Sequence, residues 1–216
     1  MQSQRGCFIT LEGLDGAGKS THVQWLVEHI SAQGIAVVCT REPGGTELGE
    51  QLRQMVLSQP MHLKTETLLM FAARCEHIAT VIEPALQAGH WVVCDRFTDA
   101  SYAYQGGGRE LGNAAIASLE QWVHPGLQPD RTWLFDVPLS VARERLARSR
   151  DLDRFEKEGD AFFERTRKAY HQRAAQCPQR LRIVDSTLPI ESVRATMREQ
   201  TQQLIDAWKN AGSAQP

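Results

Sequence analysis

A glycine-rich run near the start of the chain has the residue types and spacing of a phosphate-binding loop. Its glycines permit backbone conformations that larger residues avoid, so successive N–H groups can point at one anion. Lys19 can reach the outer phosphates of a nucleotide, and the Ser20 hydroxyl can join the coordination shell of Mg²⁺. We therefore predict a nucleoside triphosphate site with Mg²⁺, formed by Gly13, Leu14, Asp15, Gly16, Ala17, Gly18, Lys19, Ser20 and Thr21.

A second charged group, Asp95 and Arg96, follows a strand-like run at residues 91–95. In an open parallel sheet, ligands bind at the carboxyl ends of the strands. Arg96 is then placed to hold two phosphates at once, and Asp95 is a further candidate for contact with Mg²⁺. The alternative is a surface ion pair between the two, which would contribute only about 0–1 kcal/mol.

Two other charged segments are ambiguous when they are considered alone. Residues 40–46 read Thr-Arg-Glu-Pro-Gly-Gly-Thr, which is typical of a loop with a solvated ion pair, and Arg53 after it would be a surface charge. A later basic run is interleaved with acidic residues, which predicts a solvated helix face followed by a mobile loop. Functional and structural interpretations stay open for each of its members: Arg143, Arg145, Arg148, Arg150 and Arg154.

Strand-like and helix-like patterns alternate along the chain. Apolar β-like runs occupy residues 7–12, 35–40, 91–95, 132–137 and 181–185, and longer helical patterns separate them. This alternation predicts an α/β fold with a mainly parallel sheet and helices on both faces. We expect one domain over residues 1–216, since a second core would be cramped in a chain of 216 residues.

Two helical segments have particular features. Residues 65–89 predict a long helix that Pro84 bends or interrupts. Residues 190–208 carry an apolar stripe and predict a packing helix, followed by a frayed tail over residues 210–216.

Composition excludes several classes of partner. The formal net charge of -2 argues against electrostatic binding to nucleic acid or to an anionic membrane. No apolar run approaches the ~20 residues that span a bilayer, and the first residues lack an export signal. We therefore expect a cytoplasmic protein. The cysteines show no metal-binding spacing, and Cys7, Cys39 and Cys94, in apolar runs, are expected to be buried free thiols.

A phosphate-binding loop alone is compatible with kinases, GTPases and mechanical ATPases. The chain has no Asn-Lys-x-Asp sequence of the kind that reads guanine, which argues against a GTPase. A motor ATPase usually needs a larger chain or a basic polymer track. A kinase for a small acceptor is favoured, and its acceptor has to be identified from other motifs.

The motifs taken together resemble those of bacterial thymidylate kinases. The resemblance extends from residue 8 to about residue 208, and its middle motifs are more specific than the phosphate-binding loop. It implies transfer of the γ-phosphoryl group of ATP, with Mg²⁺, to dTMP, which yields dTDP for the supply of dTTP. It also implies a homodimer, a five-stranded parallel sheet and a lid at about residues 143–158. The motifs are the loop itself and residues 40–46, 95–97, 103–109 and 152–156.

The resemblance also implies roles for individual side chains. Lys19 and Ser20 would hold the ATP phosphates and Mg²⁺, and Arg96 would bridge the donor and acceptor phosphates. Two arginines, Arg41 and Arg53, correspond to residues at or near the dTMP phosphate. The thymine ring would be bound by Arg74, Ser101 and Gln105.

The resemblance leaves two choices between residues open and implies one further contact. Family members commonly carry an aromatic residue four positions before the equivalent of Arg74; this chain has Met70 there and Phe71 one position later, and either could form the floor of the base site. Either Arg148 or Arg150 of the lid would be the catalytic arginine. The acid Asp15 implies a contact near the 3′-hydroxyl of dTMP.

Two other functions stay open as alternatives to phosphorylation of dTMP. A kinase of another small acceptor, such as a deoxynucleoside, would use the same fold. A regulatory switch would hydrolyse nucleotide slowly without any acceptor.

Overall fold

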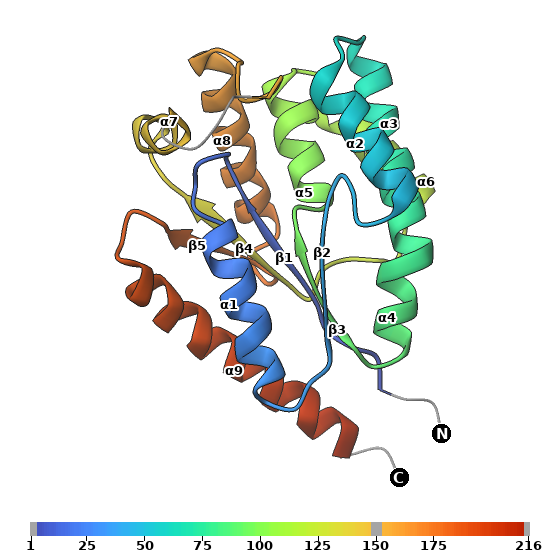
Figure 1. Ribbon diagram of the computed structural model, residues 1–216, viewed down its shortest axis with the longest axis vertical. Helices are drawn as coiled ribbons and strands as arrows, with labels where there is room; N and C mark the ends of the chain where they lie inside the picture. Colours follow the sequence, from blue (N-terminus) through green and yellow to red (C-terminus); the bar gives the residue numbers. More distant parts are fainter. Residues whose placement is uncertain (1–3, 148–152, 214–216) are drawn as a thin grey trace.

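Five parallel strands form the sheet at the centre of the computed structural model, which describes residues 4–147 and 153–213 (Figure 1). Within these residues the strand order is β2-β3-β1-β4-β5. This order puts the loop after β1 in the middle of the carboxyl edge of the sheet. The strands are β1 (Phe8–Gly13), β2 (Val37–Arg41), β3 (Trp91–Asp95), β4 (Arg131–Asp136) and β5 (Leu181–Asp185).

Alternate residues of the central strand β1 pack against opposite layers of helices, as the two-residue period of a strand requires. Ile9 and Leu11 belong to a core cluster that includes Leu26 of helix α1 (Ser20–Ser31) and Met197 of helix α9 (Ile190–Ser213). Phe8 instead belongs to a cluster on the other face. Figure 1 shows α1 and α9 side by side against the strands.

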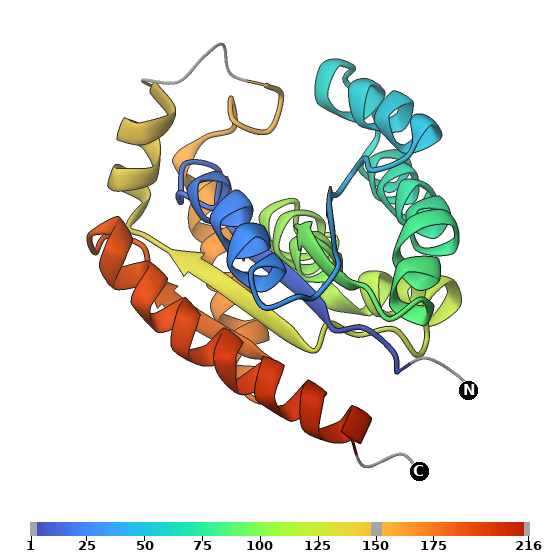
Figure 2. The same cartoon turned by 60° about the horizontal axis from the view of Figure 1, so that its bottom comes forward.

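The remaining helices cover the other face and the sheet's β2 end, except the helix at Leu139–Ala147, whose Ala142 belongs to the same core cluster as α1 and α9 (Figure 2). Two segments are π-helical: η1 joins α3 to α4, and η2 continues α5. The elements are α2 (Glu47–Ser58), α3 (Leu63–His77), η1 (Ile78–Ile82), α4 (Glu83–Gln87), α5 (Thr98–Ser101), η2 (Tyr102–Gly108), α6 (Asn113–Val123), α7 (Leu139–Ala147) and α8 (Asp160–Gln176).

The predicted fold class is confirmed. The strands at residues 91–95 and 181–185 have the expected bounds, and the other three lie within two residues of them. These runs were readable because parallel strands buried on both faces are apolar almost throughout. No described helix is both long and apolar enough to cross a membrane.

The long helix expected over residues 65–89 is interrupted before Pro84 rather than at it. Helix α3 ends at His77, and the π-helical segment η1 precedes α4, with Pro84 in the first turn of α4. Proline lacks an N–H and its ring clashes with the carbonyl four residues earlier. A wider turn just before it relieves this clash, which accounts for the position of η1.

One local prediction is wrong, and one stays a prediction. Helix α9 continues to Ser213, beyond the expected end near residue 208, and Trp208 donates its indole N–H to the Arg5 carbonyl at 2.8 Å. Fraying of the tail over residues 210–216 stays a prediction. Residues 214–216 lie outside the described part of the chain. Cys7 and Cys94 are buried free thiols as expected, but Cys39 is exposed because β2 is an edge strand of the sheet.

Candidate active site

The loop after β1 has the backbone geometry of an anion cradle. Its glycines Gly16 and Gly18 have φ of 80° and 93°, which other residues rarely adopt. A Cβ at Gly16 would also lie 2.4 Å from the Ala142 carbonyl oxygen, so α7 packs closely against the loop. Helix α1 begins at Ser20, directly after the loop, and directs its N-terminal N–H groups and its dipole toward the loop's concave side.

Lys19 is buried at the centre of this loop. Its ammonium group donates to the carbonyl oxygens of Gly13 and Leu14, both at 3.1 Å. Burial, followed by the nearby Arg96 charge, lowers the pKa of Lys19. The Ser186 hydroxyl donates to the Ala17 carbonyl at 2.6 Å and ties the loop to the end of β5. The loop is therefore held in shape by the packing of α7, by the Lys19 side chain and by Ser186.

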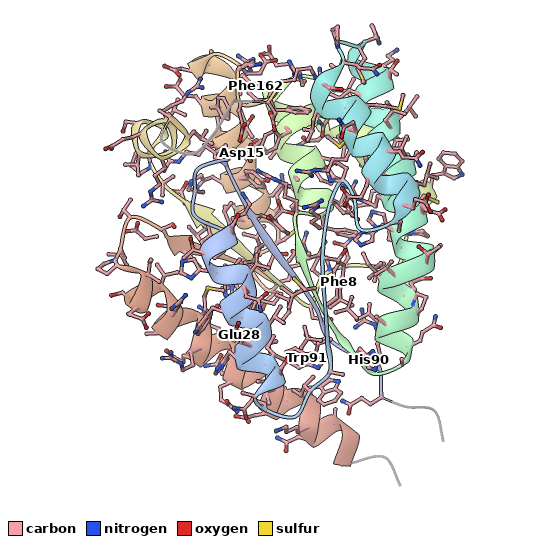
Figure 3. All side chains as sticks on the ribbon, viewed as in Figure 1. Phe8, Asp15, Glu28, His90, Trp91 and Phe162 are labelled. Carbon is pink, nitrogen blue, oxygen red and sulfur yellow. The ribbon has the colours of Figure 1, made fainter. Side chains whose placement is uncertain are left out.

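Two adjoining cavities open at this edge of the sheet. The donor cavity, of about 460 Å³, lies over the loop and includes Lys19, Ser20 and Asp95 in its lining. The acceptor cavity, narrower at about 70 Å³, extends toward α2 and α3. Their shared wall consists of Asp15, Glu42, Arg53 and Arg96. Figure 3 shows Asp15 at the top of the loop after β1, far from Trp91 and His90 at the opposite end of the sheet.

The acceptor cavity brings together most of the residues predicted for dTMP. Sequence reasoning missed several other lining residues, although Glu42 and Tyr104 lie inside motifs that it had singled out. The predicted residues that line the cavity are Asp15, Arg53, Met70, Arg74, Arg96, Ser101 and Gln105; those missed include Glu42, Pro43, Leu57, Phe97, Ala100, Tyr104, Asp153 and Phe155.

Arg96 stands in the shared wall and is held from several sides. One terminal nitrogen donates to the Gly13 carbonyl at 2.9 Å and to Tyr170 Oη at 3.1 Å. The other donates to Asp15 Oδ1 at 2.6 Å and to Tyr104 Oη at 3.0 Å. Its backbone has φ of 72°, a left-handed conformation that costs a non-glycine residue on the order of 1–2 kcal/mol. These contacts offset that cost and fix the guanidinium between the cavities.

The ionic partner of Arg96 is thus Asp15 and not Asp95. Burial alone would raise the pKa of Asp15, but the Arg96 and Lys19 charges and the hydrogen bond from Tyr104 lower it to about 2. The alternative of a surface pair between Asp95 and Arg96 is therefore wrong. Asp95 Oδ1 is buried and has no hydrogen-bond partner among the described residues.

The buried side chain of Glu12 supports the turn that carries Arg96. Its Oε1 accepts from the Phe97 N–H at 2.7 Å, and its Oε2 accepts from the Tyr170 hydroxyl at 2.7 Å. Tyr170 in turn accepts from Arg96, so Glu12 fixes both the backbone and the side chain of this turn. Burial, followed by the Asp99 charge, raises the pKa of Glu12 to about 8. Sequence reasoning assigned Glu12 only to a strand, since nothing local reveals its partners.

Arg74 is 3% exposed and has one free donor. Its Nε donates to Glu42 Oε2 at 2.7 Å and its Nη2 to the Phe97 carbonyl at 3.2 Å, whereas Nη1 is buried and has no partner within residues 4–147 and 153–213. Glu42 also contacts His77, whose other ring nitrogen lies 2.6 Å from the Thr40 hydroxyl. This network holds Arg74 rigidly in the lining of the acceptor cavity.

The two candidates for the floor of the base site, Met70 and Phe71, lie in different places. Met70 lines the acceptor cavity. Phe71 is 2% exposed, packs with Tyr102 and Ile116, and lies 4.6 Å from the Arg74 guanidinium. Phe71 therefore supports Arg74 from outside the cavity, whereas Met70 belongs to the lining of the cavity.

The predicted phosphate-binding arginines differ in position. Arg53 lines both cavities and donates to the Pro43 carbonyl at 3.0 Å. Arg41 lines the donor cavity but not the acceptor cavity, and it pairs with Glu50 at 2.8 Å. The observed placement favours Arg53 over Arg41 as a contact for an acceptor phosphate.

The lid arginines Arg148 and Arg150 lie outside the described residues. Their neighbours are less solvated than the sequence predicts. Arg145 lines the donor cavity and donates to the Ser186 carbonyl at 2.9 Å. Arg154 pairs with the buried Glu66 at 2.6 Å. The prediction of a solvated face is wrong for these two arginines, because tertiary partners far away in sequence cover them.

The chain is similar in sequence to known thymidylate kinases. The thymidylate kinase family model matches residues 11–197. The thymidylate kinase of Bordetella pertussis is 68% identical over 201 residues, 93% of this chain and 97% of that protein. The thymidylate kinase of Nitrosomonas eutropha is 56% identical over 211 residues, 97% and 98% of the two chains.

A solved structure is similar in fold as well as in sequence. The crystal structure of thymidylate kinase from Ehrlichia chaffeensis aligns with a TM-score of 0.70 at 33% identity. The alignment covers 83% of this chain and 93% of that one.

Replacing Glu12 with Gln should change how stability depends on pH. A folded pKa of about 8, above the usual 4.5, means that the folded chain binds this proton more tightly than the unfolded chain does. Its contribution is fully present below about pH 4.5 and is lost as the pH rises to about 8, by about 1.4 kcal/mol per pH unit. Urea unfolding between pH 5 and 8 should therefore show the native protein losing stability relative to Glu12→Gln.

The exposed Glu28→Gln serves as the matched control, and its stability should follow that of the native protein throughout. If Glu12→Gln and the native protein lose stability in parallel between pH 5 and 8, the buried carboxylate does not titrate in this range.

Proposed function

The chain belongs to the thymidylate kinase family, and we propose that its phosphoryl donor and acceptor meet at the wall that holds Arg96. The chain is a phosphotransferase of nucleotide biosynthesis that phosphorylates dTMP to dTDP at the expense of ATP. The observation that carries the proposal is that the donor and acceptor cavities adjoin and share Asp15 and Arg96. A cytoplasmic location and a single-domain organisation stay predictions.

The donor side follows from the loop. We expect the ATP phosphates to lie against the N–H groups of residues 13–21, with Lys19 turning from the loop carbonyls to the outer phosphates. Phosphoryl transfer requires little covalent work from the protein, so acceleration comes mainly from positive charge held in place around the transferring group. Lys19 and Arg96 supply that charge from opposite sides, and a lid arginine, Arg148 or Arg150, would add to it.

The lining of the donor cavity suits Mg²⁺. The Ser20 hydroxyl and the carboxylate of Asp95 line the same cavity, and Asp95 Oδ1 has no partner among the described residues. Mg²⁺ retains several waters and binds through one or two protein oxygens plus phosphates, so a cage of acidic residues is not needed. Ser20 and Asp95 would hold the ion, which neutralises charge on the ATP phosphates.

The acceptor side follows from the free donors of the second cavity. Arg74 Nη1 is the unpaired donor available for an oxygen on the base ring, and Ser101 and Gln105 line the same space. Met70 would form the floor under the base. Arg53 would hold the acceptor phosphate near Arg96.

This arrangement argues against the two rival functions. A deoxynucleoside carries no phosphate, so it would leave Arg53 without an anion in the acceptor cavity. A regulatory switch needs only a nucleotide site, and it gives no reason for a second cavity with a buried, unpaired arginine donor beside the first.

A homodimer is also proposed. Large apolar side chains are exposed on three helices of one side of the fold, namely Leu48 and Met55 on α2, Leu68 on α3 and Trp122 on α6. Trp122 is 79% exposed, which is costly for so large an apolar side chain unless a partner covers it. Sedimentation velocity measures the mass directly, and a monomer at micromolar concentration would contradict the dimer.

An acceptor panel tests the function. With ATP and Mg²⁺, the native protein should phosphorylate dTMP much faster than other deoxynucleoside monophosphates or thymidine, and chelation of Mg²⁺ should abolish turnover. Lys19→Met should lower kcat by roughly 10²–10⁵-fold while the fold is kept, because charge stabilisation is lost at the transferring group. A coupled ADP assay and thermal unfolding check both expectations.

Lys64→Met is the matched control, since Lys64 is exposed on α3 and lines neither cavity. It should leave kcat unchanged. Equal turnover of dTMP and thymidine, or normal kcat in a folded Lys19→Met protein, would contradict the proposed mechanism.

A separate measurement concerns Asp15 and the sugar. Each Asp15 oxygen accepts one hydrogen bond in the structure, from Arg96 or from Tyr104, and can accept another from the 3′-hydroxyl of dTMP. The 3′-deoxy analogue of dTMP should therefore lose roughly 10- to 100-fold in kcat/KM with the native protein. Asp15→Asn should shrink this difference. If both proteins lose the same factor, Asp15 does not contact the sugar hydroxyl.

A further inference from the structure

Glu66 of α3 is a buried carboxylate that lines neither cavity. Its side chain is 1% exposed, and its Oε1 accepts from Gln105 Nε2 at 2.9 Å. Its Oε2 lies 2.6 Å from Arg154 and 3.6 Å from Arg109, measured to a guanidinium nitrogen of each. Glu66 thus joins a residue of the acceptor cavity, Gln105, to Arg154 of the predicted lid segment.

The charge on Glu66 decides which way the Gln105 amide faces. A carboxylate paired with two guanidinium groups is ionised and can only accept hydrogen bonds. Gln105 must then present its N–H donors to Glu66, because its carbonyl oxygen would meet another acceptor there. Gln105 also lines the acceptor cavity, so its Oε1 is the atom left to face a ligand.

We propose that Glu66 is a positioning residue that sets the base specificity of the site, because it makes Gln105 a hydrogen-bond acceptor toward the base. This inference rests on the proposed function, in which dTMP binds beside Arg74 and Gln105. A thymine or uracil ring carries a carbonyl oxygen next to an N–H at position 3. Arg74 Nη1 offers a donor for the carbonyl, and Gln105 Oε1 offers an acceptor for the N–H.

A cytosine ring has the opposite pattern at the same edge. It carries an amino group where thymine has a carbonyl, and its position 3 is an acceptor. Arg74 and the fixed Gln105 amide would then meet like groups, and buried polar groups left unpaired lower affinity strongly. A Gln105 amide free to flip could offer Nε2 to cytosine, so removal of the Glu66 charge should relax the preference.

The same carboxylate also holds Arg154, and this contact can be separated from the first. Arg154 donates from Nε to the Val56 carbonyl at 2.9 Å as well as from Nη2 to Glu66. Arg154→Gln removes one cation from Glu66 but leaves the contact to Gln105 and the charge of Arg109. It is therefore the matched control for a loss of packing or of lid anchoring.

The test compares dTMP with 5-methyl-dCMP, which differ only at the edge that Arg74 and Gln105 would read. The measured quantity is the ratio of kcat/KM for dTMP to that for 5-methyl-dCMP. The native protein should favour dTMP by at least about 100-fold, and Glu66→Gln should lower the ratio at least about tenfold. Arg154→Gln should keep the native ratio even where its kcat falls. In a Gln105→Ala background, Glu66→Gln should produce no further change in the ratio.

The outcomes separate this inference from the function itself. A native protein that does not phosphorylate dTMP contradicts the proposed function. A native protein that phosphorylates dTMP but shows no preference, or a folded Glu66→Gln protein with the native ratio, overturns the role of Glu66. If Glu66→Gln does not fold, Gln105→Ala carries the test: the ratio must fall there too, and an unchanged ratio overturns the inference.

Discussion

The ion pair between Arg96 and Asp15 is the interaction on which the rest of the site depends. Arg96 leaves the end of β3 in a left-handed conformation, with φ of 72°, and lies across the loop after β1. A cation there would repel Lys19 of the same loop, and Asp15, at 2.6 Å from Arg96, offsets that repulsion. The pair forms part of the wall between the cavities, so both cavities take their shape from it.

Buried carboxylates recur behind the arginines of this site. Glu42 holds Arg74, Glu66 holds Arg154, and Glu12 supports the turn that carries Arg96. In each case the acid occupies some of the hydrogen-bonding groups nearby and fixes the direction of those that stay free. A buried charge without its partner costs several kcal/mol, so Glu42 and Glu66 also penalise any other arrangement of the site. The same buried acids therefore make the site rigid and limit which ligands it can bind.

The sequence predicts the parts of this structure that are encoded locally. Apolar runs revealed the buried strands, and the glycine spacing of residues 13–21 revealed the loop. Contacts between distant segments cannot be predicted in this way, because they depend on how the helices pack on the sheet. They include the partner of Asp15, the burial of Glu12 and the different positions of Met70 and Phe71 relative to the acceptor cavity. The exposure of Cys39 has the same origin, since an apolar run does not reveal an edge strand.

The most direct test of the account is a double-mutant cycle on kcat with Asp15→Asn and Arg96→Lys. If Asp15 acts by holding Arg96 between donor and acceptor, each replacement lowers kcat, by roughly 10²-fold for Arg96→Lys. The double variant is then no slower than the slower single variant, because the second change removes a partner that is already lost. Losses that multiply in the double variant would show that the two side chains act independently, and would contradict the account.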